Sequence, residues 1–251
     1  MRTQKTAVMT FLMMTGLAHA GSKEAMPVVT IRVENEARVD ERIVREAQKE
    51  AVAILARAGV KLIWADCGRG GSDWESREAC KHSRGPNEFW MQITMDRPHW
   101  SPKETLGFSD LAHGDGSGGV YYPAVLALVR DLRGEAPQLL AAAMVHEVGH
   151  LILGANAHTH AGVMCGDWSQ EQYKLISAGR LDFAPGQPKL LQAEVKRRVS
   201  EKQQHQQVAA RISSKSHLQP VSPQIPSRTP SRRLLPAGST TLSCSDMNCR
   251  L

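Results

Sequence analysis

HEVGHLILGANAHTHAGVM, residues 146–164, is the stretch around which the rest of the chain is organised. His146 and His150 stand four residues apart, so on a helix both imidazoles leave the same face and can share one metal ion. Glu147 lies between them, where a carboxylate can take a proton from a water that the metal activates. The pattern HExxH on a helix is typical of zinc-dependent hydrolases and predicts that Glu147 is the catalytic base.

The helix that carries this motif is expected over residues 138–153, with Pro137 in its first turn. Its residues are apolar almost all round, which is typical of a helix buried in the middle of a domain. Buried imidazoles and a buried carboxylate are costly without partners, and a metal ion supplies one. The expected ion is Zn2+, because neutral imidazoles suit it and a catalytic zinc site keeps three protein ligands plus a water.

Three residues compete to be the third zinc ligand. Gly154 is placed to end the helix in a left-handed turn, after which the chain doubles back and His158 reaches the metal. His160 would point the same way as His158 on an extended segment. Glu171 is the rival from another class, because thermolysin-like enzymes take a downstream glutamate. We favour His158 and leave the other two open.

These residues, with the turn at 162–164, resemble the extended zinc motif and Met-turn of the metzincin metallopeptidases. The resemblance implies that Met164 forms a hydrophobic floor beneath the zinc and that Glu147 is the general base. It implies a twisted sheet, a buried active-site helix and a C-terminal helix. It also implies that an edge strand pairs with an extended substrate, for which residues 120–122 are the expected segment. The implied zinc ligands are His146, His150 and His158.

The spacing departs from the usual metzincin pattern HExxHxxGxxH. Three residues separate His150 from Gly154, and three more separate Gly154 from His158. This excess of two residues argues against the matrixin and astacin branches. No tyrosine lies two residues after Met164, so the extra tyrosine ligand of some branches has no counterpart.

The segment before the motif predicts an α/β or α+β fold with a mixed sheet. Residues 27–33 and 60–65 read as strands, and between them Asp40 offers an N-cap for a helix that stops at Gly59. A strand, a helix and a strand make a βαβ unit with a parallel pair and a right-handed crossover. Residues 89–95 alternate like a third strand.

The remaining elements follow from shorter signals. Residues 105–119 read as a flexible, glycine-rich loop that lacks the lysine and hydroxyl placement of a phosphate loop. Residues 120–129 are apolar with one proline, which favours an edge strand or a bulge. Ser169 is expected to cap a helix over residues 170–178, and residues 187–204 read as a basic amphipathic helix.

The N-terminal residues predict export. Residues 1–20 combine a basic start, a short apolar run and an Ala-x-Ala site, which is typical of a secretory signal peptide cleaved after Ala20. We therefore expect a secreted or periplasmic protein without a transmembrane anchor. The expected blocks that follow are a zinc metallopeptidase domain over 21–185, a basic C-terminal helix over 186–212 and a disordered Pro/Ser-rich tail over 213–251.

The charge is unevenly distributed. Residues 21–185 carry 18 Lys and Arg against 22 Asp and Glu, whereas residues 186–251 carry 11 against 3. A basic, Pro/Ser-rich end is typical of a solvated segment and predicts weak contact with anionic surfaces at most, without a specific nucleic-acid partner. We expect a monomer whose partner is a peptide or protein substrate.

Five cysteines in an exported chain predict disulfides with one thiol left over. Cys67 and Cys80 flank a polar loop and can close it, and Cys244 and Cys249 can close a second, smaller one. Cys165 is then unpaired. It is expected to be a buried thiol, with a disulfide partner or a zinc ligand as the alternatives.

Together these features predict a secreted zinc metallopeptidase that hydrolyses peptide bonds with Glu147 as general base. Two alternatives remain open. One is a zinc-binding but non-catalytic exported module whose basic tail binds an anionic surface. The other is a thermolysin-like peptidase that uses Glu171 as its third ligand.

Overall fold

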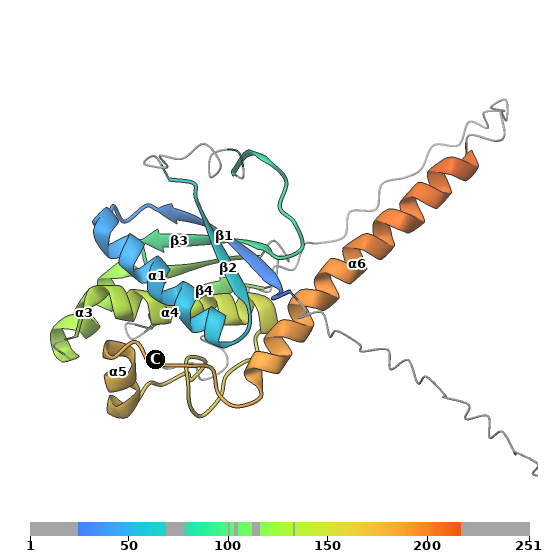
Figure 1. The fold of residues 1–251 in the computed structure, drawn as a ribbon. Coiled ribbons are helices and arrows are strands. Elements are labelled where there is room, and N and C mark those ends of the chain that lie inside the picture. The colour runs from blue at the N-terminus through green and yellow to red at the C-terminus, as the bar shows by residue number, and fades with distance from the viewer. Residues whose placement is uncertain are drawn as a thin grey trace, which may run out of the picture.

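A computed structural model describes residues 25–68, 78, 80–99, 101–102, 105–111, 116–132 and 134–216. Helices and one mixed sheet of five strands build the fold (Figure 1), which confirms the predicted α+β architecture. The signal peptide predicted at residues 1–20 lies outside the described residues. So does the disulfide predicted between Cys244 and Cys249.

The sheet has the strand order β2-β1-β3-β5-β4. β2 and β4 are its two outermost strands. β1 pairs in parallel with β2 and β3, β3 pairs in parallel with β5, and only β4 runs antiparallel to its neighbour. Their bounds are Val28–Asn35 for β1, Lys61–Asp66 for β2, Glu88–Thr94 for β3, Gly107–Asp110 for β4 and Ser117–Tyr121 for β5.

The helix α1, Glu41–Arg57, forms as the sequence predicts. The Asp40 carboxylate accepts a hydrogen bond from the Arg42 backbone N–H at 2.8 Å, which caps the first turn. Gly59 adopts a φ of 75° just beyond the last turn, where a side chain would be strained. The predicted strand, helix and parallel strand are therefore confirmed.

The helix α4, Ala136–Leu153, is the centre of the core. Every residue from Leu139 to Ile152 is buried, and the helix packs against α1 and against β4 and β5. By length and composition it is apolar enough to cross a membrane, the one such helix in the described part of the chain. Its burial inside the fold accounts for that composition.

The prediction of a loop over residues 105–119 is wrong in part, because this segment contains β4 and the start of β5. Gly118 and Gly119 are buried, and a Cβ at Gly119 would come within 2.6 Å of the Phe108 ring. These glycines therefore allow the two strands to pack closely around Phe108, so they do not mark a flexible loop.

The prediction of an edge strand or a bulge over residues 120–129 is also wrong. β5 ends at Tyr121, and the helix α3, Tyr122–Leu132, begins at the next residue. Pro123 lies in the first turn of α3, where the absence of an N–H costs nothing. β5 is an inner strand, so the free edge of the sheet on this side belongs to β4.

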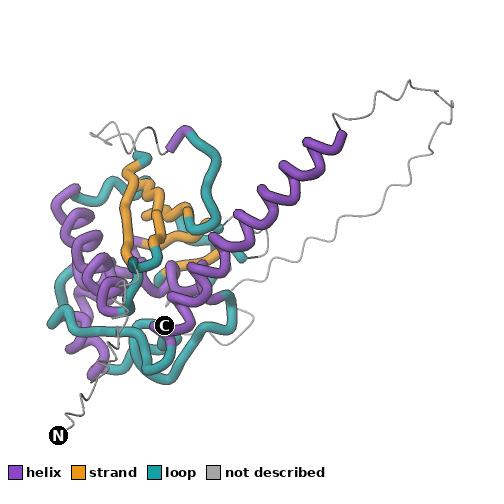
Figure 2. The backbone as a smooth tube through the Cα atoms, turned by 45° about the vertical axis from the view of Figure 1, so that its right-hand side comes forward, coloured by secondary structure: helices purple, strands orange, loops and turns teal. Residues whose placement is uncertain are grey.

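Two helices follow the motif. Ser169 caps α5, Gln170–Ser177, with a capping box to Gln172. α6, Gln187–Ser216, begins as predicted but runs well past residue 204 and into the tail expected to be disordered. Figures 1 and 2 show it leaving the body of the fold and projecting away from the sheet.

The cysteines behave as predicted where they are described. Cys67 and Cys80 form a disulfide, and Cys165 is free and buried. The Cys165 thiol donates to the Asp167 carbonyl at 3.1 Å. It is therefore a buried thiol, the first of the three alternatives.

Candidate metal centre

The helix α4 presents His146, Glu147 and His150 inside the protein. The two imidazoles are 2% and 1% exposed, and the Glu147 side chain is 3% exposed. The helix is held there by apolar packing on all its faces, so the three polar groups share a site that bulk water barely reaches. Each of them needs a polar or metallic partner to offset its burial.

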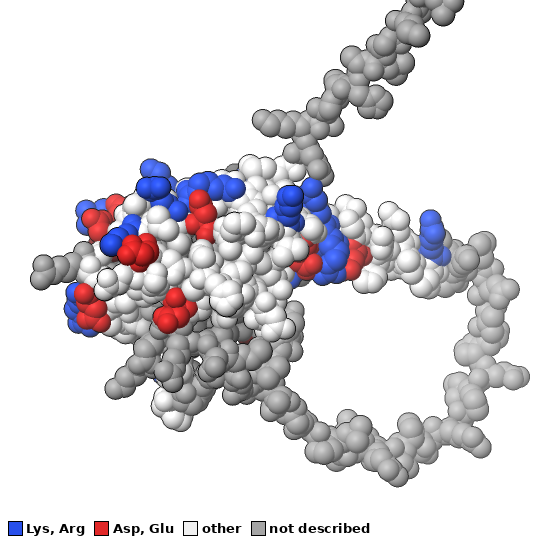
Figure 3. All heavy atoms as spheres, turned by 90° about the horizontal axis from the view of Figure 1, so that it is seen from below, with Lys and Arg blue, Asp and Glu red and all other residues white. Residues whose placement is uncertain are grey.

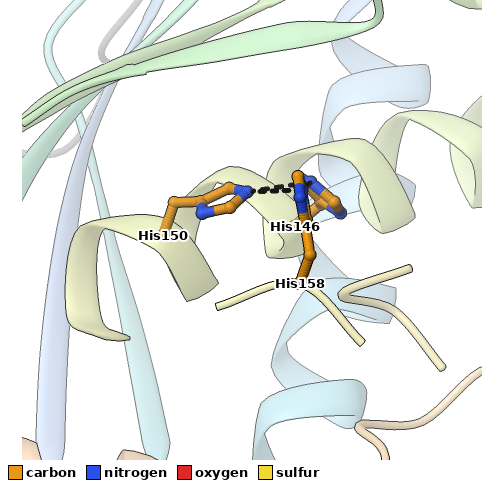
Figure 4. Close-up of side chains that lie close together, drawn as sticks. All are labelled: His146, His150 and His158. Atoms are coloured by element: carbon orange, nitrogen blue, oxygen red, sulfur yellow. Dashed lines mark hydrogen bonds between the residues drawn. The ribbon is translucent and has the colours of Figure 1, made fainter. Parts of the chain in front are cut away.

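His158 completes a triangle of imidazoles with His146 and His150 (Figure 4). Gly154 ends α4 with a φ of 89°, and the chain then returns towards the helix. The Nε2 atoms lie 3.1 Å apart between His146 and His150, 3.0 Å between His150 and His158, and 3.2 Å between His158 and His146. Two nitrogens on a tetrahedral zinc ion are separated by about 3.3 Å, so the triangle fits zinc closely.

Backbone carbonyls fix the tautomers of the two helical histidines. His146 Nδ1 lies 2.8 Å from the Val163 carbonyl, and His150 Nδ1 lies 3.2 Å from the Gly154 carbonyl. A carbonyl only accepts, so each Nδ1 carries the proton and each Nε2 directs a lone pair into the triangle. Two lone pairs that face each other without a proton repel, and a cation removes that repulsion.

The pKa values agree with neutral imidazoles. Burial, with the neighbouring His150 next in weight, lowers the pKa of His146 to about 3, and burial lowers that of His150 to about 4. The pKa of His158 is also lowered by burial. Neutral imidazole is the form that binds metal ions.

The rival third ligands lie elsewhere. His160 is exposed to solvent, and the exposed Glu171 carboxylate pairs with Lys174 at 3.2 Å on the surface of α5. Within the described residues, the one cluster of side chains close enough to hold a metal is His146, His150 and His158. The preference for His158 is thus supported by the geometry, whereas a ligand role for Glu171 is not.

The edge strand β4 holds Glu147, which the sequence did not reveal. Ser109 Oγ lies 2.8 Å from Glu147 Oε2 and donates a hydrogen bond to it. Gly107 faces the same carboxylate, since a Cβ there would come within 2.6 Å of Oε1. Burial raises the pKa of Glu147 to about 8, and the Ser109 hydrogen bond acts in the opposite direction.

Met164 packs against α4 at the turn between His146 and His150. Its side chain is fully buried, and a Cβ at Gly149 would overlap its sulfur atom. Gly149 lies on α4 between His146 and His150, so Met164 packs against the turn of the helix that carries the two histidines. The Thr159 N–H donates to the Met164 carbonyl at 3.0 Å, which ties this turn to the His158 segment.

Three more side chains support the centre without having been predicted. Trp168 packs edge-on against the His146 ring, with 6.1 Å between centroids. Gln187, at the start of α6, donates to the Ala157 carbonyl at 2.8 Å, next to His158. Arg198 of α6 donates to the Leu151 and Ile152 carbonyls at 2.8 and 2.9 Å, in the last turn of α4. Nothing in their local sequence connects them with the motif.

A scan of protein-family models and a search of curated proteins both find no match to this chain.

Proposed function

We propose that this chain is an exported zinc-dependent peptidase of metzincin type. The observation that carries the proposal is the convergence of three imidazole Nε2 atoms, 3.0–3.2 Å apart, beside a buried glutamate on the same helix. A catalytic zinc site has three protein ligands and one open position, and a carboxylate beside it can act as the general base. No other described cluster offers metal ligands.

A zinc ion held by His146, His150 and His158 would supply a water of lowered pKa and would polarise the scissile carbonyl. Glu147 would take the proton of the attacking water and pass it to the leaving amine. Ser109 would hold one Glu147 oxygen in place and leave the other for this transfer. The low exposure of the site would keep bulk water from the reacting groups.

The substrate class follows from the free edge of β4. This strand touches Glu147 through Gly107 and Ser109, and no described strand pairs with its outer side. An extended peptide can add to such an edge by main-chain hydrogen bonds, which would lay a peptide bond beside the catalytic glutamate. β4 thus takes the role that the sequence had suggested for residues 120–122.

The metzincin assignment is supported by Met164 beneath α4 and by Gly154 at the helix end. The longer spacing is accommodated by residues 155–157, which bridge from Gly154 to His158 while all three Nε2 atoms still meet. The fully buried α4 and the α6 helix that follows the turn also agree with that family pattern.

The proposal is tested by replacing Glu147 with glutamine. We expect Glu147→Gln to retain one zinc per chain and to lose about 10²- to 10⁴-fold in hydrolysis of an unfolded protein substrate, the usual contribution of a general base. The matched control is Glu171→Gln, which makes the same change on the exposed surface and should leave both zinc content and activity unchanged.

Full activity in Glu147→Gln would exclude the mechanism. A wild-type protein that binds zinc but hydrolyses no peptide would instead favour the non-catalytic module. Zinc loss in Glu171→Gln would favour the thermolysin-like arrangement.

A further inference from the structure

A groove runs from the start of β3 and the end of β4 to the exposed half of α6. Its inner chamber, about 440 Å³, is walled by Phe89, Leu111 and Leu151 and by two carboxylates, Asp110 and Glu88, of which Glu88 pairs with Arg32. Its outer chamber, about 620 Å³, is walled by Lys202, His205 and Ala209 of α6. Both chambers share the segment 84–86 and Arg198, so they are neighbours, and we call the two together the groove.

The inner chamber is not lined by the residues of the proposed chemistry, but two of its wall residues are their neighbours in the sequence. Leu151 directly follows His150 on α4, and Asp110 directly follows Ser109 on β4. A chain paired with the free edge of β4 would therefore continue past Asp110 into the groove. Antiparallel pairing is the more stable mode per residue, and it directs the N-terminal end of the added chain towards the groove.

The outer chamber carries a positive charge that the acidic side chains of the described residues do not neutralise. Glu201 pairs with Arg197, and the Arg198 guanidinium is held by Glu194 at 2.9 Å. Lys202 forms no ion pair within the described residues, and Arg84 donates only to the Gly116 carbonyl, at 3.3 Å. Figure 3 shows basic side chains mixed with acidic ones at the base of α6 and a basic side chain further along it.

The tail of the chain is a poor occupant, because residues 217–251 contain four arginines and one aspartate and would be repelled. A nucleic acid would match the charge but would not use the main-chain groups of β4. An acidic polypeptide can form main-chain hydrogen bonds with β4, and its negative charge complements the outer chamber. We propose that the groove binds acidic side chains of the substrate on the N-terminal side of the cleaved bond, a specificity that rests on the proposed peptidase function.

Binding and cleavage are measured separately to test this. A fluorescein-labelled peptide with glutamates before its cleavable segment is titrated into Glu147→Gln protein and followed by polarisation. Two matched peptides carry glutamines at the same positions or glutamates after the cleavable segment. Each exposed ion pair contributes at most about fivefold in affinity, so with two free cations we expect about tenfold tighter binding of the first peptide.

Charge reversal in the groove identifies the surface. In the Glu147→Gln background, Lys202→Glu should weaken binding of the acidic peptide about three- to tenfold, and Arg84→Gln should weaken it about threefold. The control is Lys49→Glu, an equal charge change on the exposed face of α1, which should leave binding unchanged. Wild-type protein should cleave the acidic peptide with a lower KM and a similar kcat.

Three results would overturn the groove as an acidic-peptide site. They are equal binding of the three peptides, equal weakening by Lys49→Glu, and a Lys202-dependent preference for a labelled oligothymidylate of the same charge. Selective binding of the acidic peptide without cleavage by the wild-type protein would contradict the proposed peptidase function but support the groove as an acidic-peptide site. Cleavage of all three peptides without a preference would support the peptidase function but contradict the acidic-peptide site.

Discussion

The helices α4 and α6 form under opposite conditions. α4 is buried on all sides from Leu139 to Ile152, and tertiary packing supplies its stability. The outer part of α6, from residue 200 to 212, is exposed throughout, and local contacts such as the pair between Arg197 and Glu201 support it. The candidate site residues lie on α4, which is closely packed on all sides. The exposed part of α6 instead offers a surface to which a partner can bind.

The two helices meet at Arg198. Its guanidinium reaches the carbonyls at the end of α4 and lies over the Phe89 ring, 5.2 Å from the centroid. Orphan carbonyls at a helix end need donors, and here the donor comes from another helix. We therefore expect a substitution on α4, or at its contact with α6, to lower the free energy of unfolding much more than a matched substitution on the exposed part of α6.

The largest effect is expected from filling the space at Gly149. Gly149→Val should lower the free energy of unfolding by about 3 kcal/mol, because the added methyl groups would overlap the Met164 side chain. The control on α6, Ala210→Val at an exposed position, should cost no more than about 0.7 kcal/mol, the difference in helix propensity. Urea denaturation with a chelator present measures both without a contribution from metal binding.

The double variant Gly149→Val with Met164→Ala isolates the contact. If the overlap causes the loss, the second substitution should cost less in the valine background than alone. Additive losses would show that Met164 does not support this turn.

An intermediate effect is expected at the junction of the helices. Arg198→Ala should destabilise the fold by about 2 kcal/mol, because it leaves the Leu151 and Ile152 carbonyls without their charged donor. Its neighbour Arg197 bonds only to Glu194 and Glu201 on the same helix, so Arg197→Ala should cost less than about 1 kcal/mol. If urea denaturation shows the same loss of unfolding free energy in both variants, Arg198 does not stabilise the end of α4.

The smallest effect is expected from removing the end of the chain. Deletion of residues 213–251 should change the melting temperature and the hydrolysis of a neutral peptide within measurement error, since α6 is already fully exposed before that point. Calorimetry and a peptide assay measure the two quantities. A large drop in either would mean that the tail contributes to the folded body.

The correct predictions came from strong local signals. Asp40 and Gly59 bound α1, Ser169 caps α5, and the apolar periodicity around His146 marks a buried helix. Capping residues and burial patterns act within one or two turns, so a single sequence contains them. The placement of His146, Glu147 and His150 on one buried helix was therefore predicted with its register.

The errors lie where tertiary packing decides. Gly118 and Gly119 read as a loop, because the sequence does not show that Phe108 fills the space above them. Pro123 read as a break in a strand, although it starts α3. Ser109 was missed for the same reason: its hydrogen bond to Glu147 spans 38 residues, and its own segment had been read as a loop.

The contact of Arg198 with α4 also bears on synthesis. The ribosome delivers the three histidines forty or more residues before Arg198, and Gln187 comes 29 residues after His158. Until these later residues emerge, the end of α4 and the His158 segment lack the donors that hold them. A nascent chain that already contains His146, His150 and His158 therefore still lacks the two later side chains that hold these segments in the folded protein.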